Sequence, residues 1–187
     1  MYVAFFFIAQ IFPILLLLFV IYFLLRPLIN GAVYFPTTPR NVETIVTMAG
    51  VRPGQRAADL GSGDGRIVIA LARAGAEVHG YEVNPLLVWK SRRAIKRTGI
   101  GHKAFIHWKS FWRRDLSSFD VVVVYGIPYI MKKLGDKLHR ELKPGALIIS
   151  NIYEFPQWSP LYSENRVYLY NKEYLWYTAL QQGGSRR

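Results

Sequence analysis

The feature that most constrains the fold is a glycine-rich stretch at residues 59–65, with the sequence DLGSGDG. An apolar run, RAADLG, leads into it, and a segment with helical periodicity, GRIVIALARAG, leads out of it. Glycines between a strand and a helix allow a tight turn, and they let the backbone approach a ligand closely. The stretch therefore predicts a strand–turn–helix unit with a ligand at the turn. A turn with no ligand is the alternative, and it would need no acidic residues nearby.

Acidic residues do accompany the glycines, and they indicate the kind of ligand. Gly61, Gly63 and Gly65 have a G-x-G-x-G spacing, not the G-x-G-x-x-G of dinucleotide-binding domains. Asp59 would repel a pyrophosphate at the helix N-terminus, whereas it suits a ligand with a cationic sulfonium and an ammonium group. Glu82 ends the next apolar run, where a carboxylate can accept both hydroxyls of a ribose. The pattern favours S-adenosylmethionine over a dinucleotide.

Strand-like and helix-like runs alternate along the chain after residue 40. The predicted helices cover residues 41–50, 65–75, 85–99 and 130–142, and the predicted strands cover 56–61, 77–82, 103–110, 119–126 and 145–152. Two runs with period-two alternation, 166–171 and 173–180, predict a terminal antiparallel pair. Such alternation implies a doubly wound α/β sheet, in which ligands bind beyond the carboxyl ends of the strands.

The N-terminal segment has a different character, because residues 4–25 contain no charged side chain. A helix of this length, at about 1.5 Å per residue, spans the hydrocarbon core of a bilayer. No basic residue precedes the segment and no small-residue cleavage pattern follows it, which argues against a signal peptide, and it has no polar face for a core helix. Arg26 and Arg40 follow it. We therefore predict a single-pass transmembrane helix with the rest of the chain on the cytoplasmic side.

The formal net charge of +12 lies almost entirely after this segment. Anionic lipid headgroups, an acidic or nucleic-acid partner, and solubility alone are three possible reasons for it. Beside a predicted membrane anchor, lipid is the simplest partner. The basic run KSRRAIKR, at residues 90–97, is typical of a solvated helix face. The chain has no cysteine and its four histidines lack ligand spacing, so we expect no metal site.

The stretch DLGSGDGRIVIALA resembles motif I of the class I S-adenosylmethionine-dependent methyltransferases. The pieces GYEVNPLLVWKSRRA, KSFWRRDLSSFDVVVVYGIP, KLHRELKPGALIIS and FPQWSP resemble one small family within that class, the membrane-anchored protein-lysine methyltransferases. Its eukaryotic members modify the ATP synthase c subunit and the adenine nucleotide translocase of mitochondria. The resemblance implies a seven-strand Rossmann-like sheet and S-adenosylmethionine as cofactor. The expected domains are an anchor at 1–28, a linker at 29–40 and a methyltransferase domain at 41–187.

The resemblance also implies roles for particular residues. Asn84 would begin the next helix against the ribose that Glu82 holds. Ser110 would bond the edge of the adenine, and Phe111 or Trp112 would stack on its face, although core packing is an equal alternative for these aromatic rings. The implied cofactor-binding residues are Asp59, Gly61, Ser62, Gly63, Asp64, Gly65, Glu82, Asn84, Ser110 and Phe111.

The catalytic candidates follow from the acceptor. A lysine must lose its proton before it attacks a methyl group, so a polar group is expected near the methyl. Tyr125 and Pro128, after the fourth strand, and Glu43, on the helix after the linker, are the candidates, together with residues 151–155. Thr37 and Thr38 of the linker are expected to close over the cofactor.

The predicted function is methylation of a lysine side chain of a membrane protein. A methyltransferase for a lipid or a small molecule at the membrane, and a non-catalytic membrane scaffold, are the alternatives. A nucleic-acid enzyme is disfavoured, because YGIP differs from the D/N-P-P-aromatic element of amino-directed DNA methyltransferases. The expected partners are the bilayer and a membrane protein that carries the acceptor lysine, without nucleic acid or metal.

Overall fold

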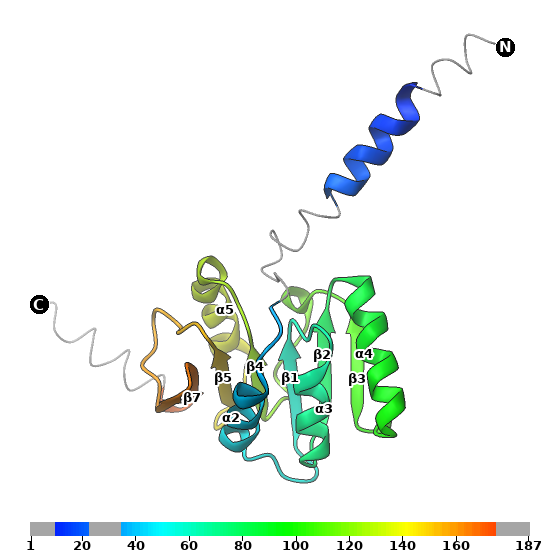
Figure 1. Cartoon of the computed structure of the whole chain (residues 1–187). Helices are drawn as coiled ribbons and strands as arrows, with labels where there is room; N and C mark the ends of the chain where they lie inside the picture. Colours follow the sequence, from blue (N-terminus) through cyan, green and yellow to red (C-terminus); the bar gives the residue numbers. More distant parts are fainter. Residues whose placement is uncertain (1–9, 23–34, 175–187) are drawn as a thin grey trace, which may run out of the picture.

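A computed structural model of the chain describes residues 10–22 and 35–174 (Figure 1). The strands are β1 (Arg56–Leu60), β2 (Glu77–Glu82), β3 (Ala104–Trp108), β4 (Val121–Val124), β5 (Leu147–Asn151), β6 (Tyr162–Glu164) and β7 (Val167–Asn171). The helices after residue 35 are α2 (Pro39–Ala49), α3 (Arg66–Arg73), α4 (Pro85–Thr98) and α5 (Pro128–Glu141), with a 3₁₀ turn, η1, at Phe111–Arg113.

The described strands form one seven-stranded sheet in the order β3-β2-β1-β4-β5-β7-β6. Strands β1 to β5 pair in parallel, and β7 runs antiparallel to both β5 and β6. The prediction of a doubly wound α/β sheet is therefore confirmed. Because the order reverses direction between β1 and β4, the carboxyl ends of these two strands border the crevice where ligands bind in such sheets.

Helices cover both faces of the sheet, as Figure 1 shows. Helices α2, α3 and α4 pack with one core, which contains Val121 and Val123 of β4, and α5 packs with the other, which contains Val122 and Val124. Alternate residues of a strand point to opposite faces, so the run VVVV contributes side chains to both cores. This explains why β4 has no polar residue, as expected for a strand buried on both faces.

The C-terminal hairpin differs from its prediction. The strand predicted over 166–171 is present as β7, but its hairpin partner is the upstream β6. Asn165 and Arg166 join them with φ values of 53° and 59°, the left-handed conformation that two-residue hairpin turns require. The strand predicted over 173–180 begins in a turn at residues 172–173, and residues 175–187 lie outside the described ranges.

The predicted transmembrane helix over residues 4–25 is not supported. The described helix covers residues 10–22, and nowhere in the described ranges is a helix both long and apolar enough to cross a membrane. The rest of the predicted segment, residues 4–9 and 23–25, lies outside the described residues.

Candidate active site

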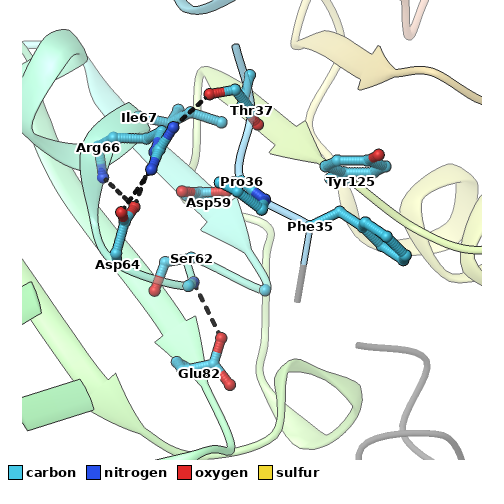
Figure 2. A pocket seen from close by; sticks show the side chains of 12 residues that line it. Phe35, Pro36, Thr37, Asp59, Ser62, Asp64, Arg66, Ile67, Glu82 and Tyr125 are labelled. Carbon is cyan, nitrogen blue, oxygen red and sulfur yellow. Dashed lines mark hydrogen bonds and ion pairs between the residues drawn. The ribbon is translucent and has the colours of Figure 1, made fainter. Parts of the chain in front are cut away.

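A pocket lies at the carboxyl ends of β1, β2 and β4 (Figure 2). Its empty volume is about 490 Å³, part of which is open to solvent. It is lined by the turn after β1, the start of α3, the end of β2, the residue after β4 and the segment before α2. The lining residues are Phe35, Pro36, Thr37, Asp59, Gly61, Ser62, Gly63, Asp64, Arg66, Ile67, Glu82 and Tyr125.

The turn after β1 takes its shape from its glycines. Gly61, Gly63 and Gly65 have φ values of 92°, 53° and 81°, in the left-handed region that other residues rarely adopt. A Cβ atom at Gly61 would meet no protein atom within 4 Å, so a side chain there would stand in the pocket. A Cβ atom at Gly65 would lie 2.8 Å from the Cβ of Ser91 on α4. The first position thus leaves room for a ligand, and the third allows two helices to pack closely.

Asp59 is the most unusual group in the pocket. Its side chain is only 2% exposed, and its Oδ2 atom has no hydrogen-bond partner in the structure. Burial, and then the nearby carboxylates of Glu82 and Asp64, raise the pKa of Asp59 to about 8. A buried carboxyl group without a partner is costly unless a ligand supplies one. A cationic ligand with hydrogen-bond donors therefore fits this position.

Glu82 is held firmly at the end of β2. Its Oε2 accepts a hydrogen bond from the backbone N–H of Gly63 at 2.9 Å, and its Oε1 accepts from those of Val83 and Asn84 at 2.8 and 2.7 Å. A carboxylate has about four lone-pair sites, so Glu82 keeps capacity for a ligand hydroxyl. The bond to Gly63 also ties the glycine turn to β2. One side chain thus fixes the turn and remains available to the ligand.

Residues 35–38, which we call the strap, close one side of the pocket. The Arg66 guanidinium donates a hydrogen bond to the Thr37 carbonyl oxygen, and it pairs with Asp64 at 2.7 Å. Behind the strap, Asn151 Nδ2 donates to Thr37 Oγ1 at 3.2 Å, and Asn151 Oδ1 accepts from Asn41 at 2.8 Å. These buried bonds fix Thr37 against the end of β5.

The strap agrees only in part with the sequence prediction for this segment. Thr37 lines the pocket as expected, whereas the Thr38 hydroxyl accepts from the Asn41 N–H and caps α2. Phe35 and Pro36 belong to the stretch predicted to be a linker, yet both line the pocket. The available signal was an aromatic residue and a proline within a stretch that otherwise resembles a linker.

Three residues predicted to bind the cofactor have other partners and do not line the pocket. The Asn84 side chain accepts from the Leu86 N–H and caps α4, and the Ser110 hydroxyl accepts from the Trp112 N–H and caps η1. Phe111 is 5% exposed and belongs to the core beneath α5. Asn and Ser are preferred helix caps, so their positions after strands suit capping as well as ligand binding.

The catalytic candidates also differ in whether they line the pocket. Tyr125 lines the pocket, and burial, with a further contribution from Tyr153, raises the pKa of its phenol, which is therefore neutral at neutral pH. Glu43 lies on the exposed side of α2, and Pro128 is the exposed first residue of α5. Neither Glu43 nor Pro128 lines the pocket, so a catalytic role for them stays a prediction from the sequence.

A mostly parallel sheet with an antiparallel strand near one edge, a glycine turn after β1, and buried acidic groups suited to a cation occur together in the S-adenosylmethionine-dependent methyltransferases. The fold and the pocket assign the chain to this class. Within the class, it belongs to the family described as the ANTKMT methyltransferase domain, whose model matches residues 59–162. The family resemblance in the sequence is thereby confirmed.

Individual relatives support the assignment. The chain is 42% identical over 127 residues to the lysine N-methyltransferase of the ATP synthase c subunit from Rattus norvegicus, and the match covers 68% of this chain and 58% of the relative. It is 37% identical over 129 residues to the adenine nucleotide translocase lysine N-methyltransferase of Mus musculus, covering 68% and 56%. The chain thus spans less than two thirds of the length of these relatives.

A solved structure is similar over nearly its whole length. This is an RNA methyltransferase from Salinibacter ruber in complex with S-adenosyl-L-homocysteine, with a TM-score of 0.70 and 32% sequence identity. The match covers 73% of this chain and 93% of that one. S-adenosyl-L-homocysteine is S-adenosylmethionine without the transferred methyl group, which agrees with the cofactor predicted from the sequence.

Proposed function

We propose that this protein transfers the methyl group of S-adenosylmethionine to a lysine side chain of a membrane protein. The main support for this cofactor is the buried Asp59 beside the glycine turn, whose Oδ2 has no hydrogen-bond partner in the structure. The names of the two curated relatives support lysine as the acceptor, and the proteins that they modify support a membrane location.

The pocket residues have separable tasks in this reaction. S-adenosylmethionine supplies a methyl group on a cationic sulfonium. Asp59 and the glycine turn would hold the charged amino-acid part, and Glu82 would accept a hydrogen bond from a ribose hydroxyl. Phe35, Pro36 and Tyr125 give the remaining wall an apolar character, which keeps water away from the reacting atoms.

The acceptor amine must arrive without its proton and in line with the methyl group. Tyr125 is the pocket residue that can orient it, because its neutral hydroxyl can accept a hydrogen bond from an amine. Catalysis would depend mainly on positioning, and the amine would lose its proton to solvent before it enters the pocket.

We also propose that the chain is held at a membrane, with the methyltransferase domain on the cytoplasmic side. The large apolar side chains of residues 11–22 are between 42% and 65% exposed, which is unfavourable in water. Arg26 and Arg40 follow this segment, as expected where the following domain is cytoplasmic. Attachment to a bilayer would raise the effective concentration of acceptors at its surface.

RNA methylation is a second candidate function. The solved structure that is 32% identical to this chain is described as an RNA methyltransferase, and a net charge of +12 suits a polyanionic substrate. The proposed membrane location disfavours this candidate, since RNA is not confined to the bilayer surface.

The experiment that tests the proposal uses membranes and total RNA from cells that lack the protein. They are incubated with the purified full-length chain and S-adenosylmethionine that carries a radiolabelled methyl group, and protein, lipid and RNA are then separated. Asp59→Ala serves as the inactive variant. Asp136→Ala removes an exposed carboxylate on α5, outside the pocket, and is the matched control.

We expect label on a membrane protein, at a lysine identified by mass spectrometry, with the wild type and Asp136→Ala but not with Asp59→Ala. Label in the lipid fraction alone would replace the proposal with a lipid methyltransferase, and label in RNA alone would favour the second candidate. No transfer, together with no binding of S-adenosyl-L-homocysteine by calorimetry, would leave a non-catalytic scaffold.

A further inference from the structure

A second concave surface, which we call the α4 groove, lies between α4 and the end of β3. Its empty volume is about 830 Å³, and it is open to solvent. Its walls are formed by Trp89, Arg92, Arg93, Lys96 and Trp108, and its floor by Pro85 and Val88 of α4. None of these residues lines the pocket that holds Asp59. The α4 groove is therefore a separate feature of the molecule.

The α4 groove is strongly basic. Helix α4 contains five basic residues and no acidic one. Within the described ranges, Arg92, Arg93 and Lys96 form no ion pair. Two nitrogens of the Arg92 guanidinium donate to the Ile106 carbonyl oxygen at 3.1 and 2.8 Å. These bonds hold the guanidinium in place and leave its other N–H groups available to a ligand. An anion is the ligand that suits such a surface.

The groove is also unusually apolar for a basic surface. Trp89 is 62% exposed, Trp108 is 55% exposed, and Leu86, one turn before Trp89, is 75% exposed. The indole N–H of Trp108 donates to the Val83 carbonyl oxygen at 3.0 Å, so what this ring offers outward is chiefly its apolar surface. Arg93 stacks over the Trp89 ring at 5.4 Å. Tryptophan next to basic residues is typical of surfaces that enter the headgroup region of a bilayer.

We propose that the α4 groove docks the domain on an anionic lipid bilayer. Lipid phosphates would bind Arg92, Arg93 and Lys96, while Leu86 and Trp89 would enter the boundary between headgroups and acyl chains. Base stacking would also use exposed tryptophans, but it gives no role to an exposed leucine. The exposed apolar side chains of residues 11–22 equally require a non-aqueous environment. The proposal rests on the membrane location proposed above, and not on the identity of the methyl acceptor.

Docking at this surface would orient the pocket. Strands β1, β2 and β3 are parallel, so their carboxyl ends share one edge of the sheet. Trp108 is the last residue of β3, and Leu86 lies in the first turn of α4, four residues after Glu82. Both therefore lie at the edge where the pocket opens. A bilayer that contacts them would stand beside the pocket, within reach of side chains close to the headgroups.

The test uses the absence of cysteine from the chain, which allows one fluorescent label at a chosen position. An environment-sensitive fluorophore is attached to the full-length Leu86→Cys variant. The control carries the same fluorophore at Asp136→Cys on α5, a helix that packs on the opposite face of the sheet from α4. The labelled chains are reconstituted into vesicles of phosphatidylcholine, with or without phosphatidylglycerol. We expect a several-fold rise in emission at position 86 when phosphatidylglycerol is present, and no change at position 136.

Charge reversals then test which residues are responsible. Each basic residue near an anionic surface strengthens binding roughly fivefold. Arg93→Glu with Lys96→Glu in the Leu86→Cys chain should therefore lower the equilibrium constant for docking by at least about 25-fold. Lys132→Glu with Arg140→Glu, on the exposed side of α5, changes the net charge equally and should leave docking unchanged. Binding of S-adenosyl-L-homocysteine should be the same in both variants, which shows that each is folded.

Three results would overturn the proposal. The first is an equal emission rise in vesicles with and without phosphatidylglycerol, and the second is an equal loss of docking in the two charge-reversal variants. The third is a response of the label at position 86 to short single-stranded RNA at physiological salt, without one to vesicles. Inorganic phosphate alone should give no response, because it lacks the apolar part of the ligand. All these readouts are independent of methyl transfer, so the docking surface and the lysine acceptor can fail separately.

Discussion

Replacement of Asp59 by asparagine is expected to stabilise the cofactor-free chain at neutral pH while it weakens cofactor binding. In the folded state the pKa of Asp59 is about 8, against an ordinary value of 3.8. Below pH 4 the folded and the unfolded chain both hold the proton. Between pH 4 and 8 the folded chain holds it and the unfolded chain releases it, so the free energy of unfolding falls as the pH rises.

The magnitude follows from this difference in pKa. Each pH unit in that interval removes up to about 1.4 kcal/mol from the free energy of unfolding, so the loss at pH 7 is on the order of 4 kcal/mol. Asp59→Asn keeps the shape of the side chain but has no proton to lose. Its stability should therefore exceed that of the wild type at pH 7, and the two should converge towards pH 4.

Denaturant unfolding of the full-length chain in mild detergent, at several pH values from 4 to 8, measures this effect. Asp136→Asn, on the exposed side of α5 and outside the pocket, is the matched control, and its stability should depend on pH as that of the wild type does. A wild-type stability that does not fall between pH 5 and 8, with no gain from Asp59→Asn, would refute the reasoning, since Asp59 would then be ionised in the free pocket. Calorimetry in buffers of different ionisation enthalpy should also detect proton release when S-adenosylmethionine binds at pH 7.

Three further substitutions probe the pocket. Glu82→Gln places an amide where three backbone N–H groups donate, and should destabilise the chain by about 2 kcal/mol and weaken S-adenosyl-L-homocysteine binding at least tenfold by calorimetry. Gly61→Ala should cost about 1 kcal/mol of stability, because φ is 92° there, and should weaken binding further because its Cβ stands in the pocket; normal affinity would contradict this. Tyr125→Phe should lower kcat roughly tenfold without changing the KM for S-adenosylmethionine, and an unchanged kcat would remove Tyr125 from amine orientation.

The sequence is sufficient for the sheet and for the acidic groups of the pocket because both depend on local patterns. Alternation of apolar runs and helical periodicity predicts β1 to β5 and the helices between them. The spacing of Asp59, the glycines and Glu82 is contained in one strand–turn–helix–strand unit. The parallel arrangement then brings both carboxylates to one edge of the sheet.

Other parts of the site depend on contacts between distant segments, which no local pattern contains. The strap is fixed by Asn151, which lies more than one hundred residues away from Thr37 along the chain. Asn84 and Ser110 follow strands, as ligand-binding residues do, but a helix cap uses the same residue types at the same positions. The pairing of β7 with β6 depends on the left-handed turn at Asn165, and a period-two pattern alone does not select the partner.

The strap has a mechanical consequence, because the wall of the pocket is continuous with the N-terminal segment. Twelve residues, 23–34, join the helix of residues 10–22 to Phe35. Fully extended, the chain from Tyr22 to Phe35 reaches at most about 47 Å. If that helix is held at a bilayer, Phe35 and the pocket wall that it forms stay within this distance of the end of the helix. An acceptor beyond this reach cannot be methylated by a chain so tethered, however well it fits the pocket. Insertion of residues between 22 and 35 should therefore enlarge the set of acceptors without altering the chemistry.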